Sequence, residues 1–225
     1  MCGRFTLTSD GNDIMDYLEV DSWDSAFTWQ PSYNIAPTQE IPVLTCKNER
    51  RIQGMHWGLV PHWSNDIKNG RRMINARAET LTEKPSYRKL IQSKRCIVVA
   101  NGYYEWMMSS QGKKPYYIHD RDNIILPFAA LWDKWQIDKK QQMISCTIIT
   151  TEPNRDLKHI HSRMPVILTK DNMNEWIDCS NTQNNVLKTL KPYRRTLDYF
   201  SVSTFVNMPL NNSKKCIESL KMERK

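Results

Sequence analysis

The sequence lacks the long apolar runs that mark membrane and secreted proteins. No stretch of its 225 residues approaches the ~20 consecutive apolar residues of a membrane span. The N-terminus also lacks the basic region followed by an apolar run that a secretory signal peptide requires. We therefore expect no membrane partner, and an intracellular, cytoplasmic protein.

The sequence also lacks paired cysteines. Its six cysteines are far apart and form no C-x-x-C pair, which excludes a disulfide framework and a zinc site in a reducing compartment. His159 and His161 could suggest a metal pair, but no third ligand occurs at metal spacing, so we expect no metal and no cofactor. Cys96 and Cys146 lie inside apolar runs and are expected to be inert core residues, whereas Cys2 lies in no such run.

Acidic residues are outnumbered by basic ones. The chain has 32 Lys and Arg against 24 Asp and Glu, a net charge of +8 and a pI near 9.2. A basic surface favours a polyanionic partner, nucleic acid first and anionic membrane second, although scattered lysines that only aid solubility remain an alternative. The eight tryptophans are a high number for this length, and proteins use Trp for packing or stacking.

Internal repeats and linkers rich in Gly, Ser or Pro are absent, which favours one domain. β-branched and aromatic runs predict strands over residues 41–46, 52–59, 96–106, 115–119, 124–132, 143–151, 164–168 and 199–206. Apolar spacing predicts helices over residues 10–20, 81–92, 170–179 and 183–191, the first capped by Ser9 or Asp10.

Many strands without regular βαβ alternation predict an α+β fold, with a mainly antiparallel, curved, barrel-like β-sheet and peripheral helices. The stretch 212–225 carries five basic and two acidic residues. We expect a domain over residues 1–210 and a mobile basic tail over residues 211–225.

The N-terminal segment Met1-Cys2-Gly3-Arg4-Phe5 offers a reactive amine. Initiator methionine is usually removed before a small residue, which would leave Cys2 with a free α-amine beside its thiol. The amine of such a 1,2-aminothiol condenses with an aldehyde to an imine, and the thiol then closes a thiazolidine ring. With a pKa of about 7.7–8.0, about a quarter of an α-amine is neutral at about pH 7.4, against roughly a thousandth of a lysine. Retained Met1 would abolish this chemistry, because the nitrogen would be an amide.

Five further segments follow in order: YNIAPT at 33–38, WGLVPHW at 57–63, INARAET at 74–80, GYYEW at 102–106 and IHSRMP at 160–165. Each is weak alone. Together with the N-terminal MCGRF, they resemble the SOS-response-associated peptidase (SRAP) family, whose members form DNA–protein crosslinks at abasic sites. The resemblance runs from Cys2 to about Val206.

The resemblance implies a catalytic set. Cys2 matches the crosslinking cysteine, and Asn75 matches the asparagine that holds the opened sugar and the N-terminal residue. Glu105 resembles the carboxylate that shuttles protons during imine formation, and His161 the histidine that protonates the sugar ring oxygen. The implied DNA contacts are phosphate contacts at Arg4, Arg77 and Arg163 and a groove lined by Asn34, Pro37, Trp63 and Thr150.

The chemistry of an abasic sugar independently requires these residue types. The sugar is mostly a closed hemiacetal, so opening it needs a general acid, and the carbinolamine must lose water through a group of intermediate pKa. The pKa of a histidine side chain is about 6.5. Desolvation beside Tyr104 and Trp106 could raise the pKa of Glu105 toward neutrality. Arginines suit phosphate, and an exposed Trp63 would stack on a base for about 1–3 kcal/mol.

Blander interpretations exist for single residues. Glu105 could be an ordinary strand-edge carboxylate and Asn75 could tie down a turn. Tryptophans 57, 106 and 132 are more typical of a core than of a stacking platform. One departure from the family concerns Ser64, where relatives often carry a second aromatic after the tryptophan, so base stacking should be weaker here.

Three functions follow as hypotheses. The leading one is an abasic-site sensor in single-stranded DNA that crosslinks through Cys2 after Met1 removal and shields the lesion during the DNA-damage response, with AP-lyase cleavage as an accompanying activity. The others are an autoprocessing thiol peptidase that cleaves the Met1–Cys2 bond, and a noncovalent single-stranded DNA binder. We expect a DNA-associated monomer, with the replication machinery as a candidate partner.

Overall fold

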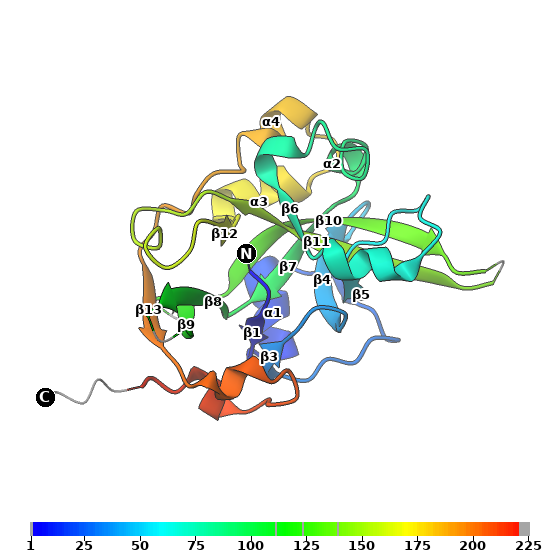
Figure 1. Cartoon of the computed structure of the whole chain (residues 1–225). Helices are drawn as coiled ribbons and strands as arrows, with labels where there is room; N and C mark the ends of the chain where they lie inside the picture. The colour runs from blue at the N-terminus through cyan, green and yellow to red at the C-terminus, as the bar shows by residue number, and fades with distance from the viewer. Residues whose placement is uncertain (1, 111, 123, 139, 221–225) are drawn as a thin grey trace, which may run out of the picture.

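The fold is built around a small closed barrel. The computed structural model describes residues 2–110, 112–122, 124–138 and 140–220 (Figure 1). Antiparallel pairing joins β5 (Arg50–Trp57), β4 (Glu40–Cys46), β7 (Arg95–Ala100), β10 (Leu126–Gln136) and β11 (Gln142–Thr151) in that order. Parallel pairing of β11 with β5, with Cys146 opposite Trp57, closes the five strands into a ring. The expected α+β fold with a curved, barrel-like sheet is confirmed.

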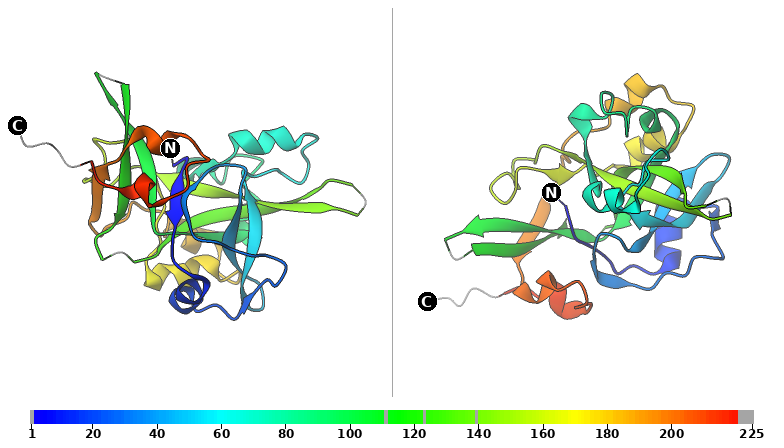
Figure 2. Two further views of the ribbon diagram at one scale, coloured as in Figure 1. Left: turned by 90° about the horizontal axis from the view of Figure 1, so that it is seen from below. Right: turned by 45° about the vertical axis from the view of Figure 1, so that its right-hand side comes forward.

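Short strands extend this sheet. They are β2 (Ser22–Trp23) beside β5, and β6 (Asn75–Arg77) and β12 (Met164–Pro165) beside β11. A second sheet of five strands has the order β13 (Leu197–Ser201), β9 (Gly112–Asp120), β8 (Gly102–Ser109), β1 (Phe5–Leu7) and β3 (Ser32–Ile35). In the two views of Figure 2 the β8–β9 hairpin projects away from the barrel.

The two sheets share one core. Phe5 of β1 packs edge-on against Trp57 and Phe128 of the barrel, with ring centroids 5.1 and 6.3 Å apart. Helices cover the outside: α1 (Gly11–Leu18), α2 (Leu90–Ser93), α3 (Lys170–Ile177) and α4 (Gln183–Leu187). The fully buried Trp176 of α3 donates its indole N–H to the carbonyl of Cys96 at 2.9 Å, which ties this helix to β7. None of the helices within the described residues is long and apolar enough to cross a membrane.

Gly58 lies where the barrel closes, and its position requires glycine. Its φ of +135° is a left-handed conformation that side chains disfavour, and its amide donates to the Cys146 carbonyl at 2.9 Å. A Cβ here would lie 2.6 Å from the carbonyl oxygen of Gly70. The glycine therefore lets the connection after β5, which carries Trp63, fold back onto the barrel.

Most expected strands are confirmed, but residues 96–106 form two strands in different sheets. The break is at Asn101, whose Oδ1 accepts the amides of Thr8 and Ser9 at 2.6 and 3.0 Å. The backbone N–H of Asn101 donates to the carbonyl of Thr6 at 2.8 Å. Asn101 therefore ties the end of β1 to the point where the chain leaves the barrel, a long-range contact that a local pattern does not reveal.

Two other expectations needed correction. Residues 81–92 were expected to be helical, but they form successive turns and only α2 at the end is helical, because Pro85 removes a backbone donor and disfavours helix at the preceding residue. The strand over residues 199–206 stops at Ser201, and a 3-10 turn follows over Thr204–Asn207. The helix over 10–20 is confirmed as α1, with Asp10 as its cap.

The C-terminal segment contacts the domain at several positions. Cys216 is fully buried, and the backbone amide of Leu220 donates to the carbonyl of Ser201 at 2.9 Å. Asn212 Oδ1 accepts the backbone amide of Tyr33 at 2.7 Å, which joins the segment to β3. The mobile tail over residues 211–225 stays a prediction, and residues 221–225 lie outside the described residues.

Candidate functional site

The N-terminal segment is held as an extension of β1. That strand pairs on both sides, with Phe5 opposite Ile35 of β3 and Tyr103 of β8. One step closer to the N-terminus, the carbonyl of Arg4 accepts the amide of Tyr104 at 2.9 Å. Cys2 is fully buried. Two-sided pairing fixes the path of the segment, so Cys2 occupies a defined place beside both sheets.

Asn75 connects Cys2 to the barrel. It begins β6, which runs parallel to β11 with Asn75 opposite Ile148. Its Nδ2 donates to the carbonyl of Cys2 at 2.8 Å. Its Oδ1 is buried and accepts no hydrogen bond from the residues that the structure describes, so a ligand hydroxyl or amine could satisfy it. The interpretation of Asn75 as a residue that only ties down a turn does not account for this bond.

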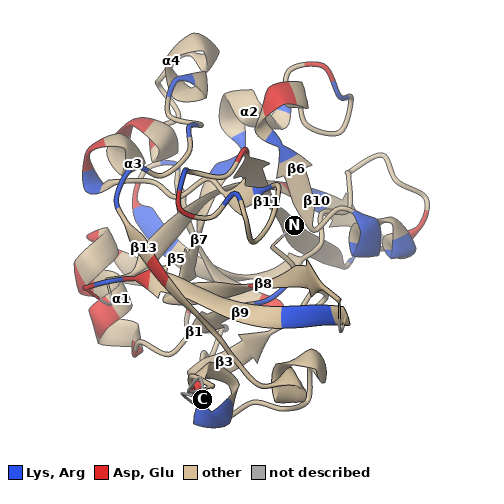
Figure 3. Cartoon of the chain, turned by 60° about the vertical axis from the view of Figure 1, so that its left-hand side comes forward, with Lys and Arg blue, Asp and Glu red and all other residues tan. Residues whose placement is uncertain are grey.

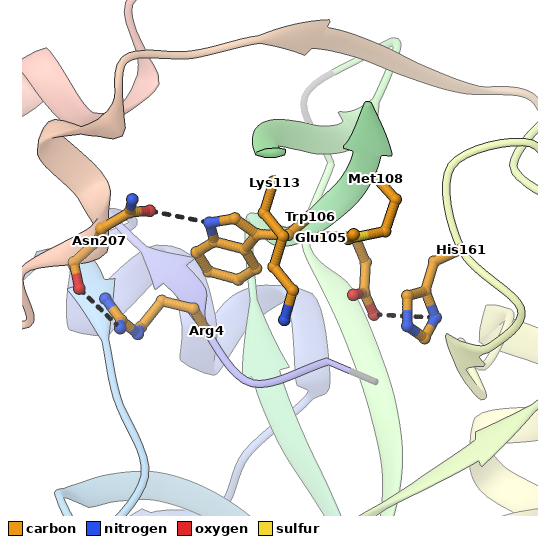
Figure 4. Close-up of a pocket in the computed structure, with 7 residues that line it drawn as sticks. All are labelled: Arg4, Glu105, Trp106, Met108, Lys113, His161 and Asn207. Atoms are coloured by element: carbon orange, nitrogen blue, oxygen red, sulfur yellow. Dashed lines mark hydrogen bonds and ion pairs between the residues drawn. The ribbon is translucent and has the colours of Figure 1, made fainter. Parts of the chain in front are cut away.

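Glu105 and His161 face each other across the site (Figure 4). Glu105 lies on β8 and is 3% exposed, and its Oε1 is 3.8 Å from His161 Nδ1. Burial raises the pKa of Glu105 to about 7, which confirms the expected shift toward neutrality. Burial also lowers the pKa of His161. Near neutral pH the site therefore combines a carboxyl group close to its midpoint with a neutral imidazole.

The backbone after His161 contacts its ring at Nδ1. The amide nitrogen of Arg163 lies 3.0 Å from His161 Nδ1, and the carbonyl oxygen of the same residue lies 3.3 Å from it. The first contact suits the tautomer protonated at Nε2, and the second suits the tautomer protonated at Nδ1. In either tautomer the ring carries an N–H group, the kind of donor that general acid catalysis uses.

The thiol of Cys2 is kept protonated. Burial, and next the charge of Glu105, raise the pKa of the Cys2 thiol far above its usual range. A protonated thiol is a weak nucleophile. The sulfur is therefore suited to act after another group has activated the carbon that it attacks.

A cavity of about 630 Å³ opens onto this site, and Figure 4 shows its lining: Arg4, Glu105, Trp106, Met108, Lys113, His161 and Asn207. Trp106 was expected in the core but forms part of this wall. Its indole N–H donates to Asn207 Oδ1 at 2.8 Å, and the Arg4 guanidinium lies 5.9 Å from its ring centroid. The sequence could have indicated Trp106 as a site residue because it is adjacent to Glu105. No local pattern indicated Asn207 as part of the site. Trp57, by contrast, is a fully buried core residue as expected.

Two of the expected DNA contacts are buried. Asn34 is 1% exposed and Thr150 is fully buried, so neither side chain offers a surface to a strand in this conformation. Asn34 Oδ1 accepts from Arg4 Nη1 at 2.7 Å. The carbonyl of Thr150 accepts from Arg163 Nη2 at 2.5 Å. Both residues hydrogen-bond to arginines, and direct contact of either one with DNA stays a prediction.

The expected phosphate-binding arginines differ in availability. Arg163 forms a two-bond ion pair with Glu79, at 2.8 and 3.0 Å, so a phosphate would have to share it or displace the carboxylate. Arg4 donates to the carbonyls of Val206 and Asn207 as well as to Asn34. Arg77 is exposed on β6.

Trp63 lies apart from the cavity that Glu105 and His161 line. It is 56% exposed and lines a second cavity of about 200 Å³ together with His62 and Arg88. The neighbouring Ser64 is buried, and its hydroxyl accepts from Asn69 Nδ2 at 2.9 Å. Pro37 is partly buried. The structure thus unites Arg4, Glu105 and His161 around one cavity beside Cys2 and Asn75, and leaves Trp63 outside it.

Replacement of Asn34 by alanine is expected to destabilise the fold. The change removes its acceptor for Arg4 and the Nδ2 bonds to the carbonyls of Val206, Met208 and Asn211, at 3.1, 3.0 and 2.8 Å. Loss of this buried network should lower the free energy of unfolding by about 2–4 kcal/mol, measured by urea denaturation. The exposed Asn48→Ala is the matched control and should change it by less than about 0.5 kcal/mol. Equal stability of the two variants would show that Asn34 is not structural.

Comparison with known proteins assigns the class. The family model described as "SOS response associated peptidase (SRAP)" matches residues 1–209, and the chain belongs to this family. It is 43% identical to the abasic site processing protein YoaM of Bacillus subtilis, over 97% of this chain and 98% of that protein. It is 44% identical to the abasic site processing protein YoqW of Bacillus phage SPbeta, over 97% and 100% respectively. A crystal structure of a Bacteroides thetaiotaomicron protein has the same fold, with a TM-score of 0.85 and 28% identity over 97% of this chain and 99% of that one.

Proposed function

We propose that this protein processes abasic sites in single-stranded DNA by forming a covalent thiazolidine link through Cys2 once Met1 has been removed. The carrying observation is the hydrogen bond from Asn75 to the carbonyl of Cys2 beside a buried carboxyl group that titrates near neutrality. That arrangement suits imine chemistry at the α-amine of Cys2. The printed names of the relatives, abasic site processing proteins, support the same substrate.

The reaction begins with the sugar. His161 donates a ring proton to the sugar ring oxygen while the Glu105 carboxylate takes the proton of the C1 hydroxyl, and the hemiacetal opens to the aldehyde. The neutral α-amine of Cys2 attacks the aldehyde carbon, a proton passes from nitrogen to oxygen, and a carbinolamine forms. Glu105, now protonated, protonates the departing hydroxyl, which leaves as water, and the proton on the nitrogen returns to His161 to give the imine. Asn75 holds the backbone of Cys2 so that the amine and the carbonyl carbon meet in one orientation.

Ring closure follows at the same carbon. The Cys2 thiol adds to the imine carbon, its proton passes to the nitrogen, and a five-membered ring replaces the hydrolysable double bond. The overall product is protein plus DNA minus one water. A link of this kind would shield the lesion from strand cleavage and from error-prone copying, which is the role in the DNA-damage response that we propose.

A thiol peptidase is the weaker alternative. Such an enzyme attacks with a thiolate, whereas burial raises the pKa of the Cys2 thiol and keeps it protonated. The amine-first sequence needs no thiolate. The raised thiol pKa therefore favours covalent capture of an aldehyde over cleavage of peptide bonds.

Intact mass spectrometry tests the proposal in one experiment. The purified protein is measured alone and after incubation with a single strand that contains one abasic site. We expect a chain without Met1 and, with the abasic strand, a species equal to protein plus DNA minus one water. The same strand with an intact base is the control and should give no adduct. A chain that retains Met1, or an equal adduct with the intact strand, would refute the mechanism.

A further inference from the structure

We infer that Lys113, on the β8–β9 hairpin, binds a backbone phosphate next to the captured sugar, so that the strand crosses Cys2 from β6 of the barrel to this hairpin. The inference deepens the proposed function and rests on it. It adds a contact on the second sheet to the arginines on the barrel side.

The cavity extends well beyond the reacting groups. It runs from Glu105 and His161 along the hairpin to Met108 and Lys113, which lie opposite each other in the β8–β9 register. An abasic nucleotide has no base, and one deoxyribose does not fill about 630 Å³. The remaining space suits the adjoining sugar–phosphate backbone.

Strand geometry separates Lys113 from its neighbour Lys114. Successive side chains of a β-strand point to opposite faces. Lys113 lines the cavity, and Figure 4 shows its ammonium between Trp106 and Glu105. The Lys114 ammonium lies over the ring of Tyr116, 5.7 Å from its centroid. The two lysines thus share charge and position along the chain but face different surroundings.

Lys113 is also the cation of this cavity with the most freedom to bind an anion. Arg4 is committed to Asn34 and to two backbone carbonyls. Lys113 is exposed, and it forms no hydrogen bond or ion pair with any residue in the described ranges. An ammonium on a flexible stem can meet a phosphate without breaking internal contacts.

The barrel supplies the opposite side of the path. Arg77 is two residues after Asn75 on β6, so both side chains leave the strand on the same face, and Asn75 there reaches Cys2. In Figure 3 basic positions lie on β6 and at the start of β9, on either side of the N-terminus. A strand whose sugar reaches Cys2 therefore has a cation for each of its two flanking phosphates.

Noncovalent binding tests the inference without the crosslinking step. The Cys2→Ala protein is titrated with a single strand containing a tetrahydrofuran abasic analogue at several salt concentrations. Adding Lys113→Gln should weaken binding about tenfold at low salt and reduce the log–log salt slope by about 0.7. Lys114→Gln is the matched control and should change neither quantity. Equal effects of the two substitutions would overturn the inference.

Backbone neutralisation identifies the phosphate. A methylphosphonate placed at one of the two linkages that flank the analogue should weaken binding of the Cys2→Ala protein and leave binding of its Lys113→Gln derivative unchanged. Equal sensitivity of both proteins at both linkages would refute the contact. Failure of the wild-type protein to crosslink would refute the proposed function instead, because this binding measurement does not require the thiol or the reaction.

Discussion

Cys2→Ser should fail to form the denaturation-stable product with abasic single-stranded DNA, its yield falling to that of a reaction without protein. Serine retains the α-amine once Met1 is removed, so the imine still forms. The hydroxyl is a far poorer nucleophile than sulfur, and the imine remains hydrolysable. Borohydride added during the reaction should trap the serine variant on DNA, which denaturing gels would detect. The trapped species would separate the role of the amine from that of the thiol.

The same variant should cleave more DNA than the wild-type protein. An imine acidifies the neighbouring sugar proton, and β-elimination then expels the 3′ phosphate when ring closure no longer competes. Cys179→Ser is the control, because this exposed thiol contacts the carbonyl of Cys46 and lies outside the catalytic cavity. An undiminished stable product in Cys2→Ser would exclude the thiazolidine, and unchanged cleavage would count against the lyase branch.

Glu105→Gln should slow crosslinking by about 10²–10⁴-fold, the usual contribution of general acid–base catalysis. The pKa of Glu105 is about 7, so its acidic form declines above that pH while the neutral amine increases through about pH 7.7–8.0. The wild-type rate should therefore pass through a maximum between these values. Single-turnover crosslinking rates measured from about pH 5 to about pH 9 test for this maximum. In the Glu105→Gln variant the rate should no longer decrease at high pH. An identical profile in both proteins would remove Glu105 from the mechanism.

The raised pKa of Glu105 should also make the free energy of unfolding depend on pH. A carboxyl group whose pKa is raised by folding stabilises the protein below its unfolded pKa, and that stability is lost as the pH rises through the folded value of about 7. The ionised Glu105 then costs about 3 kcal/mol. Glu105→Gln should gain stability relative to wild type in moving from about pH 5 to about pH 8 by urea denaturation.

Glu79→Gln is the control of opposite sign. Its hydrogen bond to Arg163 lowers the pKa of Glu79, so its contribution is present above the unfolded pKa and is lost as the pH falls. Glu79→Gln should therefore gain no stability relative to wild type between about pH 5 and about pH 8. A gain of equal size in both variants would show that burial of Glu105 is not the cause.

Local sequence patterns predicted the structure correctly where the residues of a single strand or helix determine it. The apolar strand runs predicted the barrel strands, and the cysteines inside them, Cys96 and Cys146, are fully buried as expected. Asp10 caps α1 as its side chain type predicts. Local patterns failed where distant contacts decide, as at Asn101, which ends a strand by binding the amides of Thr8 and Ser9.

The sequence by itself determined the residue types that the proposed chemistry needs: a cysteine directly after Met1, and an asparagine, a glutamate and a histidine in ordered motifs. Only the tertiary structure decided what these groups can do. Burial between two sheets raises the pKa of Glu105 to about 7, and the Asn75 bond fixes Cys2. The tertiary structure also buries the side chains of Asn34 and Thr150. Desolvation and orientation depend on residues far apart in the chain, and no local pattern encodes them.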